Sequence, residues 1–163
     1  MKSLTSTTIA IVALVLATAG CYSSTRKVLG AREPLIVGSV RVSLEAGGLL
    51  SVAGGADGDT TIDVGLPYPE TCDLVRWAGT NVVHIERYYD AWIVLLECYR
   101  KVDTTEVDPR FGCDTRYKAL ILRDDGRVFL NPESNGGTGC PPIDRDRHEF
   151  IYLAEKYVHT GGR

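Results

Sequence analysis

From residue 35 onward, apolar and polar side chains alternate in short runs, which is the pattern of half-buried β-strands. In residues 36–45 (IVGSVRVSLE), valine and leucine at positions 40, 42 and 44 alternate with serine, arginine and glutamate. Shorter strands are expected at residues 49–52 and 60–64, on either side of a loop rich in glycine and aspartate. The pattern predicts strands that each place one face against a core.

Two longer segments predict β-hairpins. Residues 81–99 (NVVHIERYYDAWIVLLECY) are rich in β-branched and aromatic residues around a Tyr-Asp turn at 89–90. The second arm of this hairpin is apolar on both faces, which is typical of a central strand in a covered sheet. Residues 117–131 (YKALILRDDGRVFLN) predict another hairpin, whose Asp-Gly pair at 125–126 suits the positive φ angles of a tight two-residue turn.

The last segment changes to helical spacing. Asp144 is a candidate cap at its start, and Gly161-Gly162 would end it. Apolar side chains recur there at intervals of three and four residues, at Phe150, Leu153, Ala154, Tyr157 and Val158. We therefore expect residues 35–163 to form one mainly β domain (α+β by content), an antiparallel β-sandwich or partly open barrel of about eight strands with one C-terminal helix.

The first twenty residues have the three parts of a secretory signal peptide. The N-terminal end carries one positive charge, residues 9–17 (IAIVALVLA) are apolar without interruption, and three small residues follow. Such a run is too short to span a bilayer, which requires about 20 apolar residues. Two cleavage sites fit the pattern: an ordinary signal peptidase could cut after Ala19, or the chain could be cut between Gly20 and Cys21.

Residues 18–21 (TAGC) resemble the lipobox of bacterial lipoproteins, in which small residues precede an obligatory cysteine. The resemblance covers only residues 1–21 and departs from the family at Thr18, where Leu, Val or Ile is usual. It implies cleavage before Cys21, a diacylglycerol on the Cys21 thiol and acylation of the freed amine. Tyr22 in place of Asp argues, by the same resemblance, against retention in the inner membrane. We expect an anchor in the outer membrane, with the domain facing the periplasm or the cell surface.

The number of cysteines favours the lipid anchor. The chain has five cysteines, and an odd number would leave one thiol of an exported protein unpaired. If Cys21 carries a lipid, the other four can form two disulfides in an oxidising compartment. Their spacing contains no C-x-x-C pair of the kind that binds metal, and we expect neither a metal nor a cofactor. The four are Cys72, Cys98, Cys113 and Cys140.

Four cysteines allow three connectivities, and the spacing leaves the choice open. A Cys113–Cys140 bond would close the open end of the hairpin at 117–131. If residues 73–77 lead as a meander into the 81–99 hairpin, Cys72 and Cys98 would lie at opposite ends of the sheet, too far apart to bond. That arrangement would favour the bonds Cys98–Cys113 and Cys72–Cys140. Either set should stabilise the fold by about 2–4 kcal/mol per bond.

The segment before the domain predicts a short tether. Residues 21–34 are expected to form the lipidated N-terminus and the tether; residues 22–34 are polar, and fully extended these reach at most about 45 Å. Removal of the signal peptide removes one of the 18 basic residues, Lys2, and leaves 17 against 21 acidic residues, a net charge of −4. This balance argues against non-specific binding of nucleic acid, which requires a basic face.

The polar clusters have ordinary structural explanations. Asp57, Asp59 and Asp63 lie in a glycine-rich loop but lack the glycine and glutamate positions of a helix–loop–helix calcium site, so a turn is favoured. His148 and His159 share a helical stripe with Tyr152 and Glu155 but stand about 16 Å apart, too far to bind one metal ion. This stripe predicts the solvated face of the helix. His84 is expected to line one side of a strand.

The remaining signal is aromatic. Tyr88, Tyr89 and Trp92 cluster at the predicted hairpin tip, and such rings are favoured in protein contacts, although they also pack over core edges. We expect a non-enzymatic binding module of the inhibitor, immunity or envelope-partner type, with a protein or the cell wall as its partner. One alternative is a small hydrolase that joins distant residues, such as His84 with Asp90 or Asp114. The other is a structural component that contributes a sheet edge to an envelope assembly.

Overall fold

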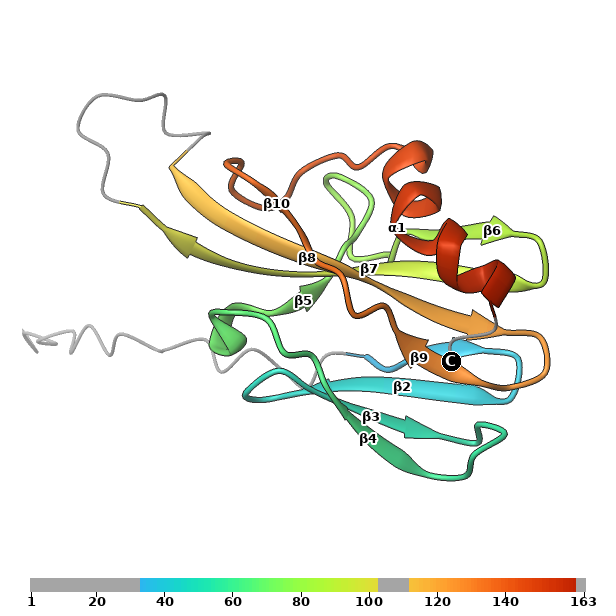
Figure 1. Cartoon of the computed structure of the whole chain (residues 1–163). Helices are drawn as coiled ribbons and strands as arrows, with labels where there is room; N and C mark the ends of the chain where they lie inside the picture. The colour runs from blue at the N-terminus through green and yellow to red at the C-terminus, as the bar shows by residue number, and fades with distance from the viewer. Residues whose placement is uncertain (1–32, 103–111, 161–163) are drawn as a thin grey trace, which may run out of the picture. The chain divides into compact units, whose positions relative to one another are not determined.

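The computed structural model describes residues 33–102 and 112–160, which form two antiparallel sheets and one helix (Figure 1). The sheets do not close into a barrel, so the mainly β, sandwich-like class with a C-terminal helix is confirmed. The described residues contain ten strands, slightly more than predicted. The predicted signal peptide, Cys21 and most of the predicted tether lie outside the described residues.

The first sheet is a meander of four strands in chain order. Val42 lies opposite Val52 in neighbouring strands, and both side chains are buried, as the alternation predicts. The strand expected at residues 36–45 is interrupted by a turn at Gly38, whose φ of 59° is a left-handed conformation that suits glycine. The strands are β1 (Leu35–Val37), β2 (Val40–Glu45), β3 (Leu49–Ala53) and β4 (Thr60–Asp63).

The second sheet is built around two long strands, β7 and β8, which pair over their whole length. On one edge, β5 and β6 pair with different parts of β7; on the other, β9 and β10 pair with different parts of β8. The predicted central strand is therefore central. The strands are β5 (Asp73–Leu74), β6 (Ile85–Tyr88), β7 (Ala91–Lys101), β8 (Cys113–Arg123), β9 (Val128–Leu130) and β10 (Asn135–Gly137). A short 3-10 turn, η1 (Pro69–Thr71), precedes β5.

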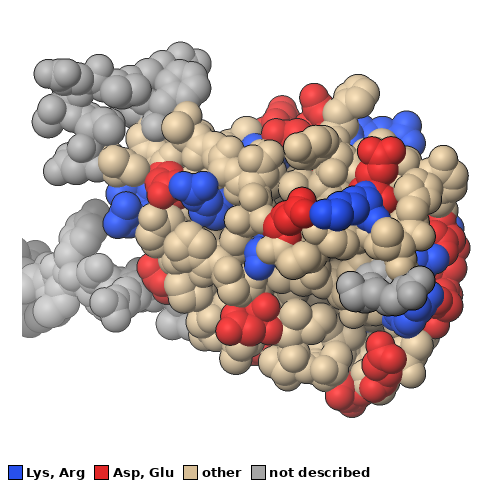
Figure 2. All heavy atoms as spheres, viewed as in Figure 1, with Lys and Arg blue, Asp and Glu red and all other residues tan. Residues whose placement is uncertain are grey.

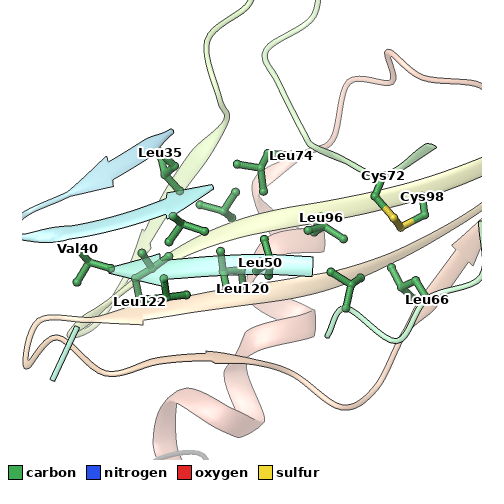
Figure 3. Close-up of a cluster of buried hydrophobic side chains, with 14 residues drawn as sticks. Leu35, Val40, Leu50, Leu66, Cys72, Leu74, Leu96, Cys98, Leu120 and Leu122 are labelled. Carbon is green, nitrogen blue, oxygen red and sulfur yellow. A yellow bond between two sulfur atoms is a disulfide. The ribbon is translucent and has the colours of Figure 1, made fainter. Parts of the chain in front are cut away.

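The second sheet separates two hydrophobic cores. Val94 and Leu96 of β7 face the first sheet, where they pack against residues such as Leu50 (Figure 3). Ile93 and Leu95 face the opposite way, toward the helix α1 (Arg147–Thr160). Both faces of β7 are therefore covered, which explains why the strand is apolar on both faces. The helix contributes Phe150, Leu153, Ala154 and Val158 to the second core, whereas Tyr157 is half-buried.

Helix α1 begins later than predicted. Asp146, not Asp144, caps it: its Oδ1 accepts the backbone N–H groups of His148 and Glu149 at 2.8 and 3.2 Å. The expected cap is wrong because Arg145, between the two aspartates, turns inward to the sheet, and the helix starts after it. The predicted end at residues 161–162 lies outside the described residues. Within the described ranges, no helix combines the length and the apolar character needed to cross a bilayer.

The solvated face of the helix is confirmed. His148, Tyr152, Glu155 and His159 are all exposed, as the stripe of polar and amphipathic residues predicts. The apolar and polar faces of α1 therefore divide as the spacing of three and four residues requires.

The disulfides are Cys72–Cys98 and Cys113–Cys140. The expectation that Cys72 and Cys98 lie too far apart is wrong, because β5 does not pair with the first arm of the 81–99 hairpin. Instead, Asp73 pairs directly with Glu97 of β7, which brings the neighbouring cysteines together. The intervening residues 76–83 fold back as a separate arm. The alternative bonds Cys98–Cys113 and Cys72–Cys140 are thereby excluded.

The turn between β8 and β9 also differs from the predicted form. A backbone bond joins Arg123 to Arg127, so the loop between these two residues contains three residues, 124–126, of which only Gly126 has a positive φ, 85°. The Arg123 N–H donates to the Arg127 carbonyl at 2.9 Å, and the Gly126 N–H donates to the Arg123 carbonyl at 3.0 Å. This is a turn followed by a glycine bulge, and it needs glycine at one position where a two-residue turn would need positive φ at two.

Candidate functional site

One end of the domain, here called the tip end, collects the turns of both hairpins of the second sheet and the last turn of α1 (Figure 1). It comprises residues 87–92, 123–127 and 158–159. The three aromatic residues predicted as a binding group, Tyr88, Tyr89 and Trp92, all lie here. The two disulfides lie toward the opposite end of the long strands, because Lys101 pairs with Cys113 there.

Tyr89 occupies the turn between β6 and β7. Its ring is packed edge-on between two others, with centroids 4.6 Å from Tyr88 and 5.0 Å from His159. The Tyr88 hydroxyl donates to Glu155 of the helix at 3.3 Å. Tyr88, Tyr89 and His159, here called the tyrosine cluster, therefore join the hairpin tip to the end of α1. Edge-to-face geometry of this kind is a favoured arrangement of aromatic rings.

The backbone of Tyr89 is in an unfavourable conformation. Its φ of 50° lies in the left-handed region, where a residue with a side chain costs about 1–2 kcal/mol. Glycine or asparagine is the usual choice for such a turn. Burial does not offset this cost, because Tyr89 is 67% exposed. The tip therefore holds a large, exposed ring at a position where a smaller residue would stabilise the fold better.

Trp92 lies on the other face of the sheet from Tyr88. The register pairs Tyr88 with Ala91 and Arg87 with Trp92, and side chains of paired residues share a face. The Arg87 guanidinium lies over the Trp92 indole, 4.7 Å from the ring centroid. The structure thus divides the predicted aromatic group into two sites, the tyrosine cluster and a separate site around Trp92.

Three ion pairs fix the turns of the tip end, and Figure 2 shows acidic and basic side chains close together there. Arg87 binds Asp124 in a bidentate pair, with N–O distances of 2.7 and 2.5 Å. Arg123 pairs with Asp90, and Arg127 pairs with Asp125. The hydrogen bond from Arg87 lowers the pKa of Asp124, and that from Arg127 lowers the pKa of Asp125. Both carboxylates are therefore ionised at neutral pH.

A polar recess of about 340 Å³ opens beside Trp92, here called the Trp92 recess. Three turns form its rim, at residues 38–39, 54–56 and 124–126. Val37 and Val40 of the first sheet and Arg123 of the second complete the lining. Sequence reasoning did not identify this recess, because it depends on how turns of two different sheets meet.

The structure places His84 away from both aspartates suggested for a hydrolase. Its ring is buried, stacks on Trp77 with centroids 3.5 Å apart, and its Nε2 lies 2.8 Å from Glu86. Asp90 pairs with Arg123 instead. Asp114 accepts a hydrogen bond from the Tyr68 hydroxyl at 2.8 Å. The combinations of His84 with Asp90 or Asp114 are therefore not formed.

The aspartates of the glycine-rich loop accept hydrogen bonds from nearby backbone N–H groups. Asp59 accepts the Gly54 N–H at 3.2 Å, and Asp63 accepts the Gly65 N–H at 2.8 Å. These bonds confirm the turn that the composition of the loop predicts. Among residues 33–102 and 112–160, no group of three histidine, cysteine, aspartate or glutamate side chains is placed to hold a metal ion.

A buried ion pair was missed by the sequence analysis. Glu97 and Arg145 lie 3.6 Å apart, and each side chain is only 6% exposed. Arg145 also lies 3.3 Å from Glu149 and 4.2 Å from the centroid of the Tyr117 ring. Burial raises the pKa of Glu97 more than Arg145 lowers it. One signal was present: a glutamate stands at position 97 on the face of β7 where Ile93 and Leu95 are apolar.

Comparison with known proteins adds no relative, since no protein-family model, curated protein or solved structure matches the chain. The tip end therefore has to be understood from its own residues. It combines an exposed aromatic cluster with turns that are held in place by arginine–aspartate pairs.

Proposed function

We propose that this protein is an envelope lipoprotein that binds a partner protein through the tyrosine cluster and catalyses no reaction. After cleavage between Gly20 and Cys21, Cys21 would carry the lipid. Residues 21–34 would then tether the domain to the outer membrane, and the domain would face the periplasm or the cell surface. The membrane and one protein partner are thus the two contacts of the molecule.

The cysteine pairing supports the anchor. Two disulfides use four of the five cysteines, so Cys21 is the one that remains. A thiol left over in an exported protein is reactive, and lipidation removes that liability. The same cysteine directly follows the small residues of the signal peptide. Dual or triple acylation at this position would hold the domain firmly, at about 0.8 kcal/mol per buried CH₂ group.

The conformation of Tyr89 is the observation that carries the binding proposal. Unfavourable backbone conformations cluster at functional positions. Tyrosine is also favoured at the centres of protein interfaces, because its rigid ring offers contact area at a low cost in entropy. At the tip, the ring is exposed yet already fixed by Tyr88 and His159. A partner would therefore meet a preformed anchor.

The test uses a photo-cross-linking amino acid in the full-length protein in intact cells. It is introduced at Tyr89 and, as a matched control, at Tyr152, a tyrosine that is 75% exposed on the outer face of α1. A discrete adduct is expected from position 89 and not from position 152. The captured protein, once purified, should bind the wild type and bind Tyr89→Asn at least tenfold more weakly, whereas Tyr152→Ala should bind normally.

Two results would contradict this part of the proposal: the same adducts from both positions, or equal affinity of the wild type and Tyr89→Asn. The anchor is tested separately with Cys21→Ala, which should move the protein from the membrane to the soluble fraction and abolish incorporation of labelled fatty acid. Unchanged membrane retention would contradict the anchor but not the binding surface.

A further inference from the structure

Beyond the protein contact proposed above, we propose that the Trp92 recess binds a neutral saccharide of one or two rings. The recess lies on the opposite face of the sheet from Tyr88, so the two contacts are separate. Four features carry this inference: the position of the indole, the rigidity of the rim, the cancellation of charge and the size of the recess.

Trp92 is placed where the sandwich ends. Val94 and Leu96, on the same face of β7, are fully buried against the first sheet. At Trp92 the first sheet has reached the turn between β1 and β2, and Gly38 and Ser39 of this turn line the recess together with Trp92. Trp92 is 36% exposed, and it lines the recess instead of belonging to the first core.

The rim of the recess is preformed. The Ala56 N–H donates to the Gly126 carbonyl at 2.9 Å and joins a loop of the first sheet to a turn of the second. A Cβ atom on Gly54 would lie 2.4 Å from the Ser39 carbonyl oxygen, so this approach of two turns requires glycine. Backbone contacts of this kind hold the rim in place before a ligand arrives, as in most small-molecule sites.

The charges of the recess cancel. Asp124 and Asp125 each bind an arginine, and Arg123 binds Asp90. The Nε atom of Arg123 has no hydrogen-bond partner but is buried, so an ionic ligand would meet no exposed charge that lacks an ion-pair partner. Carboxylates held in this way still have lone pairs that accept hydrogen bonds, and a backbone carbonyl that already accepts one bond, such as that of Gly126, has a second lone pair. Such a surface suits a ligand with many hydroxyl donors and no net charge.

The indole completes the match to a sugar. A pyranose ring has one face of C–H groups that packs on an aromatic plane, while its hydroxyls point outward to polar groups. Arg87 covers part of the indole and is not among the residues that line the recess, whereas Trp92 is. The volume of about 340 Å³ lies at the small end of the range for ligand sites, which corresponds to one or two rings.

The chain offers a direct spectroscopic test, because it contains only two tryptophans, Trp77 and Trp92. In full-length Trp77→Phe protein, the fluorescence reports on Trp92 alone. Titration with cellobiose, maltose and N,N′-diacetylchitobiose should give a saturable change with at least one of the three, with a Kd of about 1 mM, which corresponds to about −4 kcal/mol. Trp92→Phe, in which only Trp77 is left, should show no saturable change.

A second variant keeps the test valid if the loss of Trp92 harms folding. Ala56→Tyr in the Trp77→Phe background places a ring over the rim and should abolish the saccharide response while Trp92 stays in place. The proposal is overturned by no saturable change with any of the three disaccharides, by the same change in Trp92→Phe, or by a response to phosphate or spermidine instead. Tyr89→Asn should leave the titration unchanged, so this test and that of the protein contact fail independently.

Discussion

The two ends of the domain each hold a tyrosine in the left-handed conformation, and they treat it differently. At the end that carries the disulfides, Tyr68 has a φ of 65°, donates its hydroxyl to Asp114 at 2.8 Å and lies under the Arg100 guanidinium. At the tip end, Tyr89 has a φ of 50°, and most of its ring faces solvent. The backbone cost is similar, but Tyr68 has a hydrogen bond and a cation–π contact to offset it, whereas Tyr89 has edge-on ring contacts with Tyr88 and His159 and stays 67% exposed.

The difference separates a residue that stabilises the fold from one that is available for a partner. A residue whose unfavourable conformation is compensated by its neighbours belongs to the architecture. A residue that keeps a mostly exposed ring at the same cost, with ring contacts alone to compensate, is better explained by a contact outside the molecule. The ion pairs divide less sharply: Glu97 and Arg145 are buried near the disulfides, but Arg116 and Asp114 there are partly exposed, as are the pairs Arg87–Asp124 and Arg127–Asp125 of the tip end.

The largest effect is expected at the disulfide end. Replacing Cys72 and Cys98 together by alanine should lower the free energy of unfolding by about 3 kcal/mol, because a bond across a separation of 26 residues restricts the unfolded chain. Guanidinium denaturation under non-reducing conditions measures this. Arg87→Ala at the tip end is the control and should change the midpoint far less. A loss of under about 1 kcal/mol in the double variant would remove the contrast between the two ends.

An intermediate effect is expected from the buried ion pair. Glu97→Ala should lower the free energy of unfolding by about 2 kcal/mol, since it removes one partner of a buried arginine while Glu149 still offers another. Burial raises the pKa of Glu97 in the folded state above its unfolded value. The native protein then binds the proton more tightly, so this group's contribution to stability is present at low pH and falls as pH rises above about 4.3.

Glu97→Gln isolates that pH dependence, because it cannot ionise. The difference in free energy of unfolding between the wild type and Glu97→Gln should therefore move against the wild type as pH rises from about 4 to 7. Urea denaturation at several pH values measures this difference. A difference that stays constant with pH would mean that Glu97 titrates in the folded state as it does in the unfolded chain.

The smallest effect is the most direct test of the comparison. Tyr68→Gly should destabilise the domain by the worth of a hydrogen bond and a ring contact, less than the loss of a disulfide. Tyr89→Gly should leave the free energy of unfolding unchanged or raise it by up to about 0.5 kcal/mol, because relief of the left-handed strain offsets both the lost ring contacts and the added freedom of glycine in the unfolded chain. Thermal unfolding of both variants gives the two signs. Equal destabilisation would show that the Tyr89 ring serves the fold after all.

Much of the architecture could be predicted because it depends on local periodicity. Alternation fixed the inward side chains of β2, and the two apolar faces of β7 implied a covered central strand. The disulfide connectivity could not be predicted, because it depends on whether β5 pairs with β6 or bypasses it. The cap of α1 was misplaced because the inward turn of Arg145 depends on Glu97, which is distant in sequence.

The sequence predicted the position of the candidate site correctly, but not the arrangement of its side chains. The turn at residues 89–90 was predicted correctly, and a two-residue turn already implies that Tyr88 and Trp92 point to opposite faces. The left-handed conformation of Tyr89 carries no compositional signal, since glycine and asparagine are the usual markers of such a turn. The Trp92 recess is formed by turns of two sheets, so no single stretch of sequence predicts it.

The disulfides also have a consequence for the order of folding. Every strand pairing in the described residues joins strands that follow each other in the chain, except β5 with β7 and β8 with β10. Cys72 directly precedes β5 and bonds to β7, while Cys113 begins β8 and bonds to Cys140 beyond β10. Hairpins form in about 1–10 μs, whereas disulfides form in seconds or longer. The meanders are therefore expected to assemble first, and oxidation then retains the two pairings that chain connectivity leaves least secure.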